Sequence, residues 1–585
     1  MNTNTTVKVT SEQVNDVPLL VGILEDMGIR RHVDAHVGQH ASWEGISAGT
    51  IIEIWLCYML TEQDHRLVAV RGWANERREM FNALLGIELR ETDLTDDRLA
   101  VVLDKIGYEK VQAQIDGVML KEWVTVYALP SHTIRLDSTS VSVYSGIEGE
   151  NSLIQRGHSK DHRPDLGQFK IMLSTLDPLG MPLVCQVLSG QQADDKLYVP
   201  SYDQTVRLLG RSDVLVVGDS KMAALETRGH IVAGGSRYLC AYRPVGHSTA
   251  LREWVGEAFA HAADWETVSD VDKTTGEIRS VALIYNGQRT QTWLDPDTQL
   301  PHVWQERVLV VRSESMREKL LQHSRERLSH FQQALAALRR PIARGRRRYR
   351  TQAELQPVVQ ALVAKYHLAG LGTVPLLEEI LPNATSRWIV GQFSLDAQAW
   401  DTYQRQMGWQ LYLTNATPAQ YDNTALLWTY RHQVFHERTF SRLKTRQLNI
   451  RPLFLRSKPR IVGLTWLLAL ALRLLTLTEF RLRTALQQRH EGLLGLNPAV
   501  PSQAVSRPTT ERVLHAFKNL TFTAINFGTS IQHFISDLSP TQCHILALLA
   551  LPSDLYSRLA SLAPAPLTFA NLYPFVPLNS SGVVP

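Results

Sequence analysis

Apolar residues over the first 128 positions are spaced as in packed α-helices. Between residues 17 and 125 they recur at helical intervals, as in the run 51–60, and polar turns such as 92–97 separate these stretches. We therefore predict a helical N-terminal region over residues 1–128. The spacing does not single out a helix-turn-helix motif within it.

The pattern then changes to short apolar runs typical of β-strands. Three such runs, separated by turn signals, lie between residues 133 and 188. After them come a helix-like stretch, the wholly apolar run 214–217, a second helix and a further strand. This order matches that of an RNase H-like fold, so we predict an α/β catalytic core whose first part spans residues 129–245.

The remainder of the chain divides into three predicted parts. Residues 246–418 contain strand-like runs and a long basic helical stretch, which predict a large insertion domain. Residues 419–495 form the second part of the core and include the helix that bears Glu437. Residues 496–585 form a helical C-terminal region that ends in a Pro-rich tail.

Candidate chemistry lies at the ends of two strands and on one helix. The runs around 133–137 and 214–219 end in Asp137 and Asp219. In the segment 430–444, Tyr430, Glu437 and Lys444 recur every seven residues, so in a single helix they would line one face at steps of ~10 Å. Two strand-end aspartates and a helix-borne glutamate are the oxygen ligands that a two-metal phosphoryl-transfer site needs.

These residues resemble a known family. The chain resembles the DDE transposases of bacterial insertion sequences, in the insertion-sequence-four superfamily and its sixteen-thirty-four group, from about residue 17 to about residue 520. That superfamily carries Tyr, two residues, Arg, three residues, Glu, six residues, Lys. Here the pattern is Tyr430, Gln433, Glu437 and Lys444, so glutamine replaces the arginine. Further matches lie at residues 157–166, 217–222 and 448–454.

The resemblance implies a fold, a reaction and partners. The fold would be an RNase H-like core with a mainly β insertion, and the N-terminal region would recognise the terminal inverted repeats. Asp137, Asp219 and Glu437 would be both the catalytic residues and the ligands of two Mg²⁺ ions, with Mn²⁺ as a substitute. Water would nick the DNA at the element's ends, and the freed 3′-hydroxyl would join them to target DNA. The enzyme would act as a homodimer in a nucleoid-associated, cytoplasmic bacterial complex.

Several side chains are predicted to contact DNA. The arginine-rich segment 339–350 has no acids, and arginine pairs bidentately with phosphate oxygens. A solvated basic loop is the other interpretation of that segment. The loop 157–166 joins the first two strands beside the predicted metals and could touch phosphates. The predicted DNA-binding residues are Tyr430, Arg431, Gln433, Arg438, Lys444, Lys160, Arg163, Arg346, Arg347 and Arg348.

Composition adds few constraints. With 585 residues the chain is long enough for several domains, and a net charge of +4 does not by itself identify a nucleic-acid binder. The four cysteines are scattered without zinc spacing, and the polar N-terminus does not read as a secretory signal, so a reducing cytoplasm is expected. Residues 461–477 are apolar enough to approach a membrane span, but Arg473 and the basic flanks favour a buried helix.

Three other functions compete with an active transposase. One is a catalytically silent, domesticated DNA-binding protein or repressor, which the glutamine at 433 weakly favours. Another is an RNase H-like nuclease without strand transfer, against which the 430–444 signature and the large insertion speak. The last is a membrane-associated helical protein, based on residues 461–477.

Overall fold

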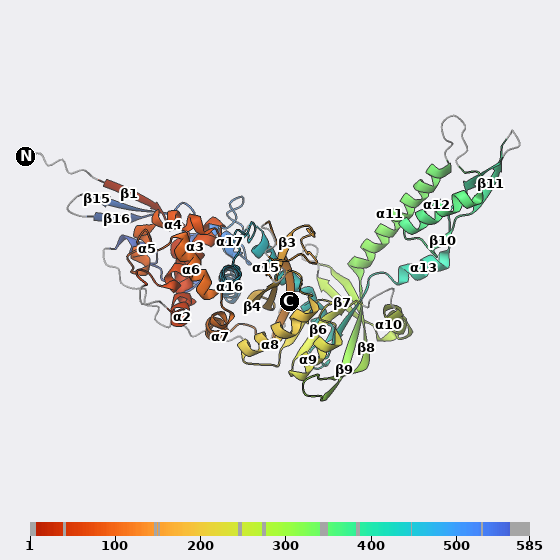
Figure 1. Cartoon of the computed structure of the whole chain (residues 1–585), viewed down its shortest axis with the longest axis horizontal. Coiled ribbons are helices and arrows are strands. Elements are labelled where there is room, and N and C mark those ends of the chain that lie inside the picture. The colour runs from red at the N-terminus through yellow and green to blue at the C-terminus, as the bar shows by residue number, and fades with distance from the viewer. Residues whose placement is uncertain are drawn as a thin grey trace, which may run out of the picture. The chain divides into compact units, whose positions relative to one another are not determined.

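A computed structural model describes most of the chain (Figure 1). The described residues are 8–38, 43–144, 149, 152–243, 249–271, 276–339, 349–381, 386–445, 447–527 and 531–561. They fall into two compact units, one formed by Met1–Tyr238 and Trp428–Pro585 and the other by Leu239–Leu427. The predicted DNA contacts Arg346, Arg347 and Arg348 and the predicted Pro-rich tail lie outside the described residues.

The first unit contains a mixed sheet with strand order β4-β3-β2-β5-β6, to which β6 contributes its first two residues. Strand β2 pairs antiparallel with β3 and parallel with β5, and β3 pairs antiparallel with β4. Helix α8 follows β4, and α9 follows β5. The predicted succession of three hairpin strands, helix, strand, helix and strand is thus confirmed. The bounds are β2 Thr133–Val143, β3 Gly167–Leu176, β4 Met181–Ser189, α8 Tyr198–Leu209, β5 Leu215–Gly218, α9 Leu225–Ala233 and β6 Arg237–Tyr242.

The N-terminal part of this unit is helical, as predicted. Helix α16, Lys458–Arg489, runs among these helices and packs on α3, α6 and strand β4 (Figure 1). Within the described residues it is the one helix long and apolar enough to cross a membrane, and its apolar stretch is buried throughout. The predicted buried helix at 461–477 is confirmed. The N-terminal helices are α1 Val17–Asp26, α2 Ile29–His36, α3 Ala48–Glu62, α4 Leu67–Asn75, α5 Arg78–Leu85, α6 Asp96–Ile106 and α7 Glu109–Val126.

The charge inside α16 has a structural partner. Arg473 is fully buried, and its guanidinium binds the Asp116 carboxylate of α7 through Nη1–Oδ1 at 2.5 Å and Nη2–Oδ2 at 3.1 Å. The same guanidinium donates to the backbone oxygens of Pro182 and Leu183 in β4. A buried charge requires such pairing, and here the pair joins α16 to both α7 and the sheet.

The two ends of the chain form a small sheet that the sequence did not predict. Strand β1, Lys8–Gln13, pairs antiparallel with β15, Thr521–Asn526, which pairs with β16, Ile531–Ile535. The prediction that the N-terminal and C-terminal regions are helical was therefore wrong for these three strands. Both β1 and β16 are edge strands with mostly exposed side chains, so they show little of the apolar alternation by which strands are recognised. The C-terminal helices are α17 Thr510–His515 and α18 Pro540–Leu548.

The second unit has both sheet and helix: the predicted strands and the predicted long basic helix are present, but three further helices in its described part mean that the unit is not mainly β as the family resemblance implied. Its main sheet has strand order β6-β14-β9-β8-β7, to which β6 contributes its last four residues. Helices α11 and α12 pack on β12 and close a separate small core around Phe331, Leu335 and Leu355. The bounds are β7 Glu266–Val271, β8 Ile278–Leu294, β9 Pro301–Ser313, β10 Gly372–Thr373, β11 Leu376–Ile380, β12 Ser386–Val390, β13 Ser394–Leu395, β14 Trp409–Thr414, α10 Thr249–Ala260, α11 Glu314–Arg339, α12 Gln352–Lys365 and α13 Ala397–Arg405.

Candidate active site

Strand register brings Asp137 and Asp219 together. Strands β2 and β5 run parallel, and the last pair in their register is Leu136 with Gly218. Asp137 and Asp219 each follow that pair by one residue, so the two residues are level with each other on neighbouring strands. Asp219 stands at the carboxyl end of β5, where functional groups of α/β sheets collect, whereas β2 continues to Val143, so Asp137 lies within its strand and not at its end. Two of the three predicted catalytic acids are therefore neighbours.

The charged form of Asp137 is disfavoured by its surroundings, although a lysine lies beside it. Its side chain is 34% exposed, and Oδ1 accepts from the Ser138 backbone N–H at 2.7 Å and lies 3.4 Å from Lys160 Nζ. Burial raises the pKa of Asp137, the Lys160 ammonium lowers it, and the nearby Asp219 charge raises it, with a net rise. Further positive charge placed beside Asp137 and Asp219 would therefore stabilise their charged forms.

Asp219 is oriented by a buried tyrosine. The Tyr198 hydroxyl, on α8, donates to Asp219 Oδ1 at 2.6 Å, and the Lys221 backbone N–H donates to the same oxygen at 2.8 Å. Burial and the charges of Asp219 and Asp137 raise the pKa of Tyr198 well above its usual value, so the hydroxyl keeps its proton. Tyr198 therefore acts as a fixed donor that leaves one oxygen of Asp219 available.

The predicted contact loop 157–166 lies along β2. The Lys160 backbone N–H donates to Ser140 Oγ at 2.8 Å, and its ammonium donates to the Ser138 carbonyl at 2.6 Å. Asp161 accepts from Ser142 and from Lys444 Nζ at 2.8 Å. Lys160 and Lys444, far apart in the sequence, are thereby brought to the strand that carries Asp137.

A fourth acid, Asp194, lies beside Lys160 and was not predicted from the sequence. Asp194 accepts from Lys170 Nζ at 2.6 Å and lies 3.8 Å from Lys160 Nζ. Although burial by itself raises the pKa of Asp194, the hydrogen bond from Lys170 and the charges of the surrounding lysines hold it below its usual range. Neither Asp194 nor Tyr198 lies in a motif, and only their place at the amino end of α8, next to the sheet edge, reveals them.

The segment 430–444 is not one helix. Helix α14, Asn423–Arg431, ends before His432, and α15 covers Gln433–Lys444. The prediction that Tyr430, Glu437 and Lys444 line a single helix is therefore wrong for Tyr430. Glu437 and Lys444 do share α15, seven residues apart. The helices separate at His432, whose backbone ψ of 3° departs from helical values.

Glu437 is exposed and stands close to the sheet without joining the aspartates. Its Oε1 accepts from Gln433 Nε2 at 2.6 Å, and its neighbour His436 is buried against β3. Across the part of the chain that the structure describes, no group of three or more acidic, histidine or cysteine side chains is arranged to hold a metal ion. The structure thus assembles Asp137 and Asp219, while Glu437 is placed on the adjacent helix.

The other predicted DNA contacts have protein partners. Arg438 donates to Glu479 Oε1 at 2.8 Å, and Arg163 binds Asp165 at 2.7 Å. The Arg431 guanidinium lies 5.5 Å from the centre of the Trp428 ring. Arg438 holds α15 to α16 through Glu479, so part of its role is structural.

Asp137 and Asp219 fit a hard divalent cation. Asp137 and Asp219 offer carboxylate oxygens, which Mg²⁺ and Mn²⁺ prefer, and their mutual repulsion would be relieved by a cation. The Lys160 ammonium already lies beside Asp137 and supplies part of that charge. The donor type of Asp137 and Asp219 is therefore compatible with a divalent cation, which stays a prediction.

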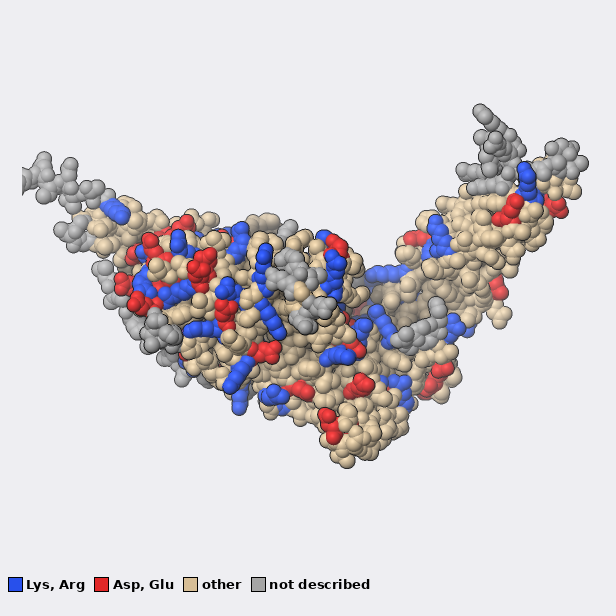
Figure 2. Space-filling view, viewed as in Figure 1, with Lys and Arg blue, Asp and Glu red and all other residues tan. Residues whose placement is uncertain are grey.

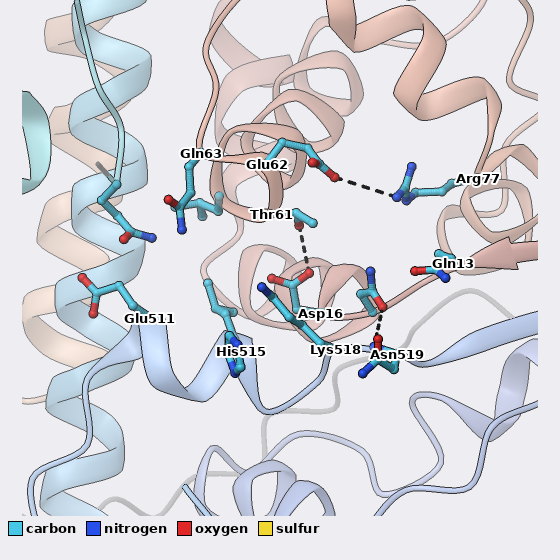
Figure 3. Close-up of a pocket in the computed structure, with 14 residues that line it drawn as sticks. Gln13, Asp16, Thr61, Glu62, Gln63, Arg77, Glu511, His515, Lys518 and Asn519 are labelled. Carbon is cyan, nitrogen blue, oxygen red and sulfur yellow. Dashed lines mark hydrogen bonds and ion pairs between the residues drawn. The ribbon is translucent and has the colours of Figure 1, made fainter. Parts of the chain in front are cut away.

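A separate polar cavity lies in the same unit. It has a volume of about 390 Å³ and lies between the N-terminal helices and the C-terminal segment (Figure 3). Asp16 in its wall is buried and accepts from Thr61 Oγ1 at 2.9 Å, and desolvation raises the pKa of Asp16 to about 6. A desolvated carboxyl group thus occurs away from Asp137 as well, so a raised pKa does not identify a catalytic acid by itself.

On the face of the N-terminal helices that Figure 2 shows, surface charge does not mark a DNA-binding site. Acidic and basic side chains are intermixed on the face of these helices seen in Figure 2. A basic face would be expected of a surface that binds DNA by charge alone.

Comparison with known proteins gives one family match and one distant structural likeness. The family model described as a domain of unknown function, DUF4277, matches residues 9–119. No curated protein matches the chain. A solved structure similar to this chain is the cryo-EM structure of a piggyBac transposase synaptic complex with hairpin DNA, at 8% identity and a TM-score of 0.30, covering 86% of this chain and 79% of that one. At these values the likeness carries no argument about this chain.

Proposed function

We propose that this protein is a DDE transposase with an RNase H-like core, which cleaves DNA at the ends of an insertion sequence and joins those ends to target DNA. The observation that carries the proposal is the parallel register of β2 and β5, which brings Asp137, within β2, beside Asp219, which directly follows β5. The family resemblance of the 430–444 segment adds Glu437 as the third acid. DNA is the partner, bound by a homodimer.

Asp137, Asp219 and Glu437 would hold the two Mg²⁺ ions, and Mn²⁺ could replace them. When bound, the ions would activate the attacking water or 3′-hydroxyl and stabilise the leaving 3′-oxygen. To bind metal together with the aspartates, Glu437 would have to give up the hydrogen bond that its carboxylate accepts from the Gln433 amide.

The residues around the acids have separate tasks. Tyr198 holds one oxygen of Asp219 by a hydrogen bond and so fixes the direction of the other. Lys160 offsets the repulsion between Asp137 and Asp219 before any metal is bound. Lys444, held by Asp161 near the end of β2, would contact the DNA backbone beside the acids. Tyr430, Arg431 and Arg163 would extend this contact surface.

A second candidate function is a catalytically silent DNA-binding protein or repressor. Two observations favour it: Gln433 stands where the family has arginine and its amide holds Glu437, and the Lys160 ammonium lies against Asp137. In that case the fold would persist as a DNA-binding scaffold while the acids no longer bind metal.

One experiment separates the two functions. Labelled duplexes that carry the DNA flanking the coding sequence are incubated with the full chain and Mg²⁺, and nicking and joining are followed for the wild type, Asp219→Asn and Glu437→Gln. The transposase is supported when the wild type nicks and joins the ends while both variants bind the same DNA without cleaving it. Equal binding by all three proteins with no cleavage under Mg²⁺ or Mn²⁺ would instead support the silent DNA-binding protein.

A further inference from the structure

Helix α15 is attached to the sheet by a short set of buried polar contacts. His436 Nδ1 and Thr175 Oγ1, on β3, lie 2.8 Å apart in a hydrogen bond, and both residues are almost fully buried. One turn further along, Thr439 Oγ1 donates to the Gly180 carbonyl in the turn between β3 and β4 at 2.7 Å. The helix therefore rests on β3 and its turn through His436, the residue before Glu437, and Thr439, two residues after it.

The turn is shaped to receive the helix. A Cβ atom added to Gly180 would lie 2.7 Å from the Phe435 carbonyl and 2.8 Å from Thr439 Oγ1. Gly180 also has φ of +69°, in the region that favours glycine. Only glycine allows the backbone of α15 to approach this closely.

The end of α14, just before α15 begins, is also attached to the sheet. Arg135, on β2 two residues before Asp137, is buried, and its Nη2 donates to Asp177 Oδ2 at 3.2 Å and to the Thr429 carbonyl at 2.5 Å. This guanidinium thus ties β2, the strand that carries Asp137, to the end of α14, the helix that immediately precedes the one carrying Glu437.

His436 is suited to a fixed contact and poorly suited to proton transfer. Burial, with the charges of Arg135 and Lys160, lowers the pKa of His436 to about 3, so the ring is neutral at physiological pH. Its Nε2 atom is buried without a hydrogen-bond partner. An unsatisfied buried nitrogen lowers stability, so the ring costs free energy that an apolar side chain would not.

We propose that His436 and Thr175 are positioning residues for Glu437: their buried hydrogen bond fixes the rotation and height of α15 on β3, and so sets where Glu437 stands relative to Asp137 and Asp219. Glu437 follows His436 directly, about 100° around the helix, so a small rotation of α15 moves its carboxylate sideways along the sheet edge. The inference rests on the proposed function, because it assigns a purpose to the position of Glu437.

The test uses Mn²⁺ alone as the probe and the full chain as the protein. Mn²⁺ binding is measured by the electron paramagnetic resonance signal of the free ion for the wild type, Thr175→Val, Thr175→Ser, His436→Leu and His436→Asn. Valine keeps the shape of threonine without the hydroxyl, serine keeps the hydroxyl, and asparagine keeps a polar group near the position of Nδ1. Folding of each variant is checked by thermal unfolding, and His436→Leu removes an unsatisfied buried nitrogen, so it remains a usable variant if Thr175→Val does not fold.

We expect Thr175→Val and His436→Leu to raise the half-saturating Mn²⁺ concentration by about tenfold, since small misplacements of a site's groups have effects of one to two orders of magnitude. Thr175→Ser and His436→Asn should stay within about twofold of the wild type. The double variant Thr175→Val/His436→Leu should be no weaker than either single variant, because both remove one contact.

Two further variants distinguish failure of the inference from failure of the proposed function. If Glu437→Gln weakens Mn²⁺ binding while Thr175→Val and His436→Leu bind like the wild type, the positioning role is overturned and the transposase stands. If Asp219→Asn binds Mn²⁺ as well as the wild type does, the metal site at Asp137 and Asp219 fails, and the proposed function fails with it.

Discussion

The strand-borne acids and the helix-borne acid of the candidate site are held in different ways. Asp137 and Asp219 follow directly on the last register pair of β2 and β5, so backbone hydrogen bonds fix their separation whatever the neighbouring side chains are. Glu437 lies on a helix that meets the sheet through the hydrogen bond between His436 and Thr175, one from Thr439 to Gly180 and the close approach at Gly180.

Because of this difference, single substitutions should affect the position of the strand acids less than the position of Glu437. A backbone ladder is a cooperative set of bonds, so one substitution in β2 or β5 leaves the two aspartates side by side. A helix held by a few side chains can shift when one of them is lost. We therefore expect loss of a strand acid to abolish chemistry outright, and loss of a helix contact to weaken it gradually.

The largest expected effect is at the strand acids. Asp219→Asn should lower the rate of DNA nicking by about 10³-fold, because it removes a charge that must stabilise the transferring phosphoryl group. Single-turnover nicking at saturating protein measures the chemical step. Asp213→Asn, at an exposed residue that pairs with Arg211 just before β5, is the matched control and should leave the rate unchanged. Equal rates for the two variants would remove Asp219 from the site.

A smaller loss is expected at the helix acid. Glu437→Gln should lower nicking by about 10²-fold with little change in unfolding temperature, since the side chain is exposed and its hydrogen bond is to the equally exposed Gln433. Gln433→Ala keeps the acid and removes its hydrogen bond, so it should change the rate by no more than about threefold to tenfold. A rate for Glu437→Gln equal to that of the wild type would confine the acid site to the strands.

The helix attachment itself can be tested at Gly180. Gly180→Ala places a Cβ against Phe435 and Thr439, so α15 must move, and we expect nicking to fall about tenfold. Gly210→Ala is the matched control: Gly210 has φ of +64° and no atom within 4 Å of the added Cβ. Both variants share the backbone strain of about 1 kcal/mol, and only the first displaces α15. Identical nicking rates would show that the position of α15 does not matter.

The smallest expected effect on activity is at Asp16, in the polar cavity. Its pKa in the folded protein is raised to about 6, so the stability that depends on its proton is complete below about pH 4 and is lost as the pH rises through 6. Asp16→Asn should therefore raise the free energy of unfolding at pH 7 by about 2–3 kcal/mol and leave nicking unchanged. Unfolding by urea at pH 4 and pH 7 tests this, and a stability difference independent of pH would contradict it.

The sequence predicted the parts of the site that depend on local pattern. The apolar runs that end at Asp137 and Asp219 predicted strands, and these strands are the neighbours that the RNase H-like order implied. The buried helix at 461–477 also followed from its composition. Asp194 and Tyr198 were missed because their role arises from contacts with Lys170 and Asp219, which no local spacing encodes.

The predictions that failed did so where local pattern is weak or long-range contacts decide. The prediction of a single helix from Tyr430 to Lys444 was wrong because the helix is interrupted at His432. Three residues earlier, Arg135 donates a hydrogen bond to the Thr429 carbonyl. The insertion was predicted as mainly β with one long basic helix; that helix is present as α11, but its packing with α12 into a separate core was not predicted. The pairing of β1 with β15 was not predicted, because edge strands with exposed side chains have no apolar alternation.

By itself the sequence determined which residues carry chemistry and which elements they follow, because apolar periodicity and residue type are local properties of the chain. Only the tertiary structure decided that Asp137 and Asp219 are adjacent, that Lys160 lies between Asp137 and Asp194, and that α15 rests on β3 through His436. Strand register, buried charge pairing and close backbone approach join residues far apart in the chain, and their free energy exists only when the whole unit has folded.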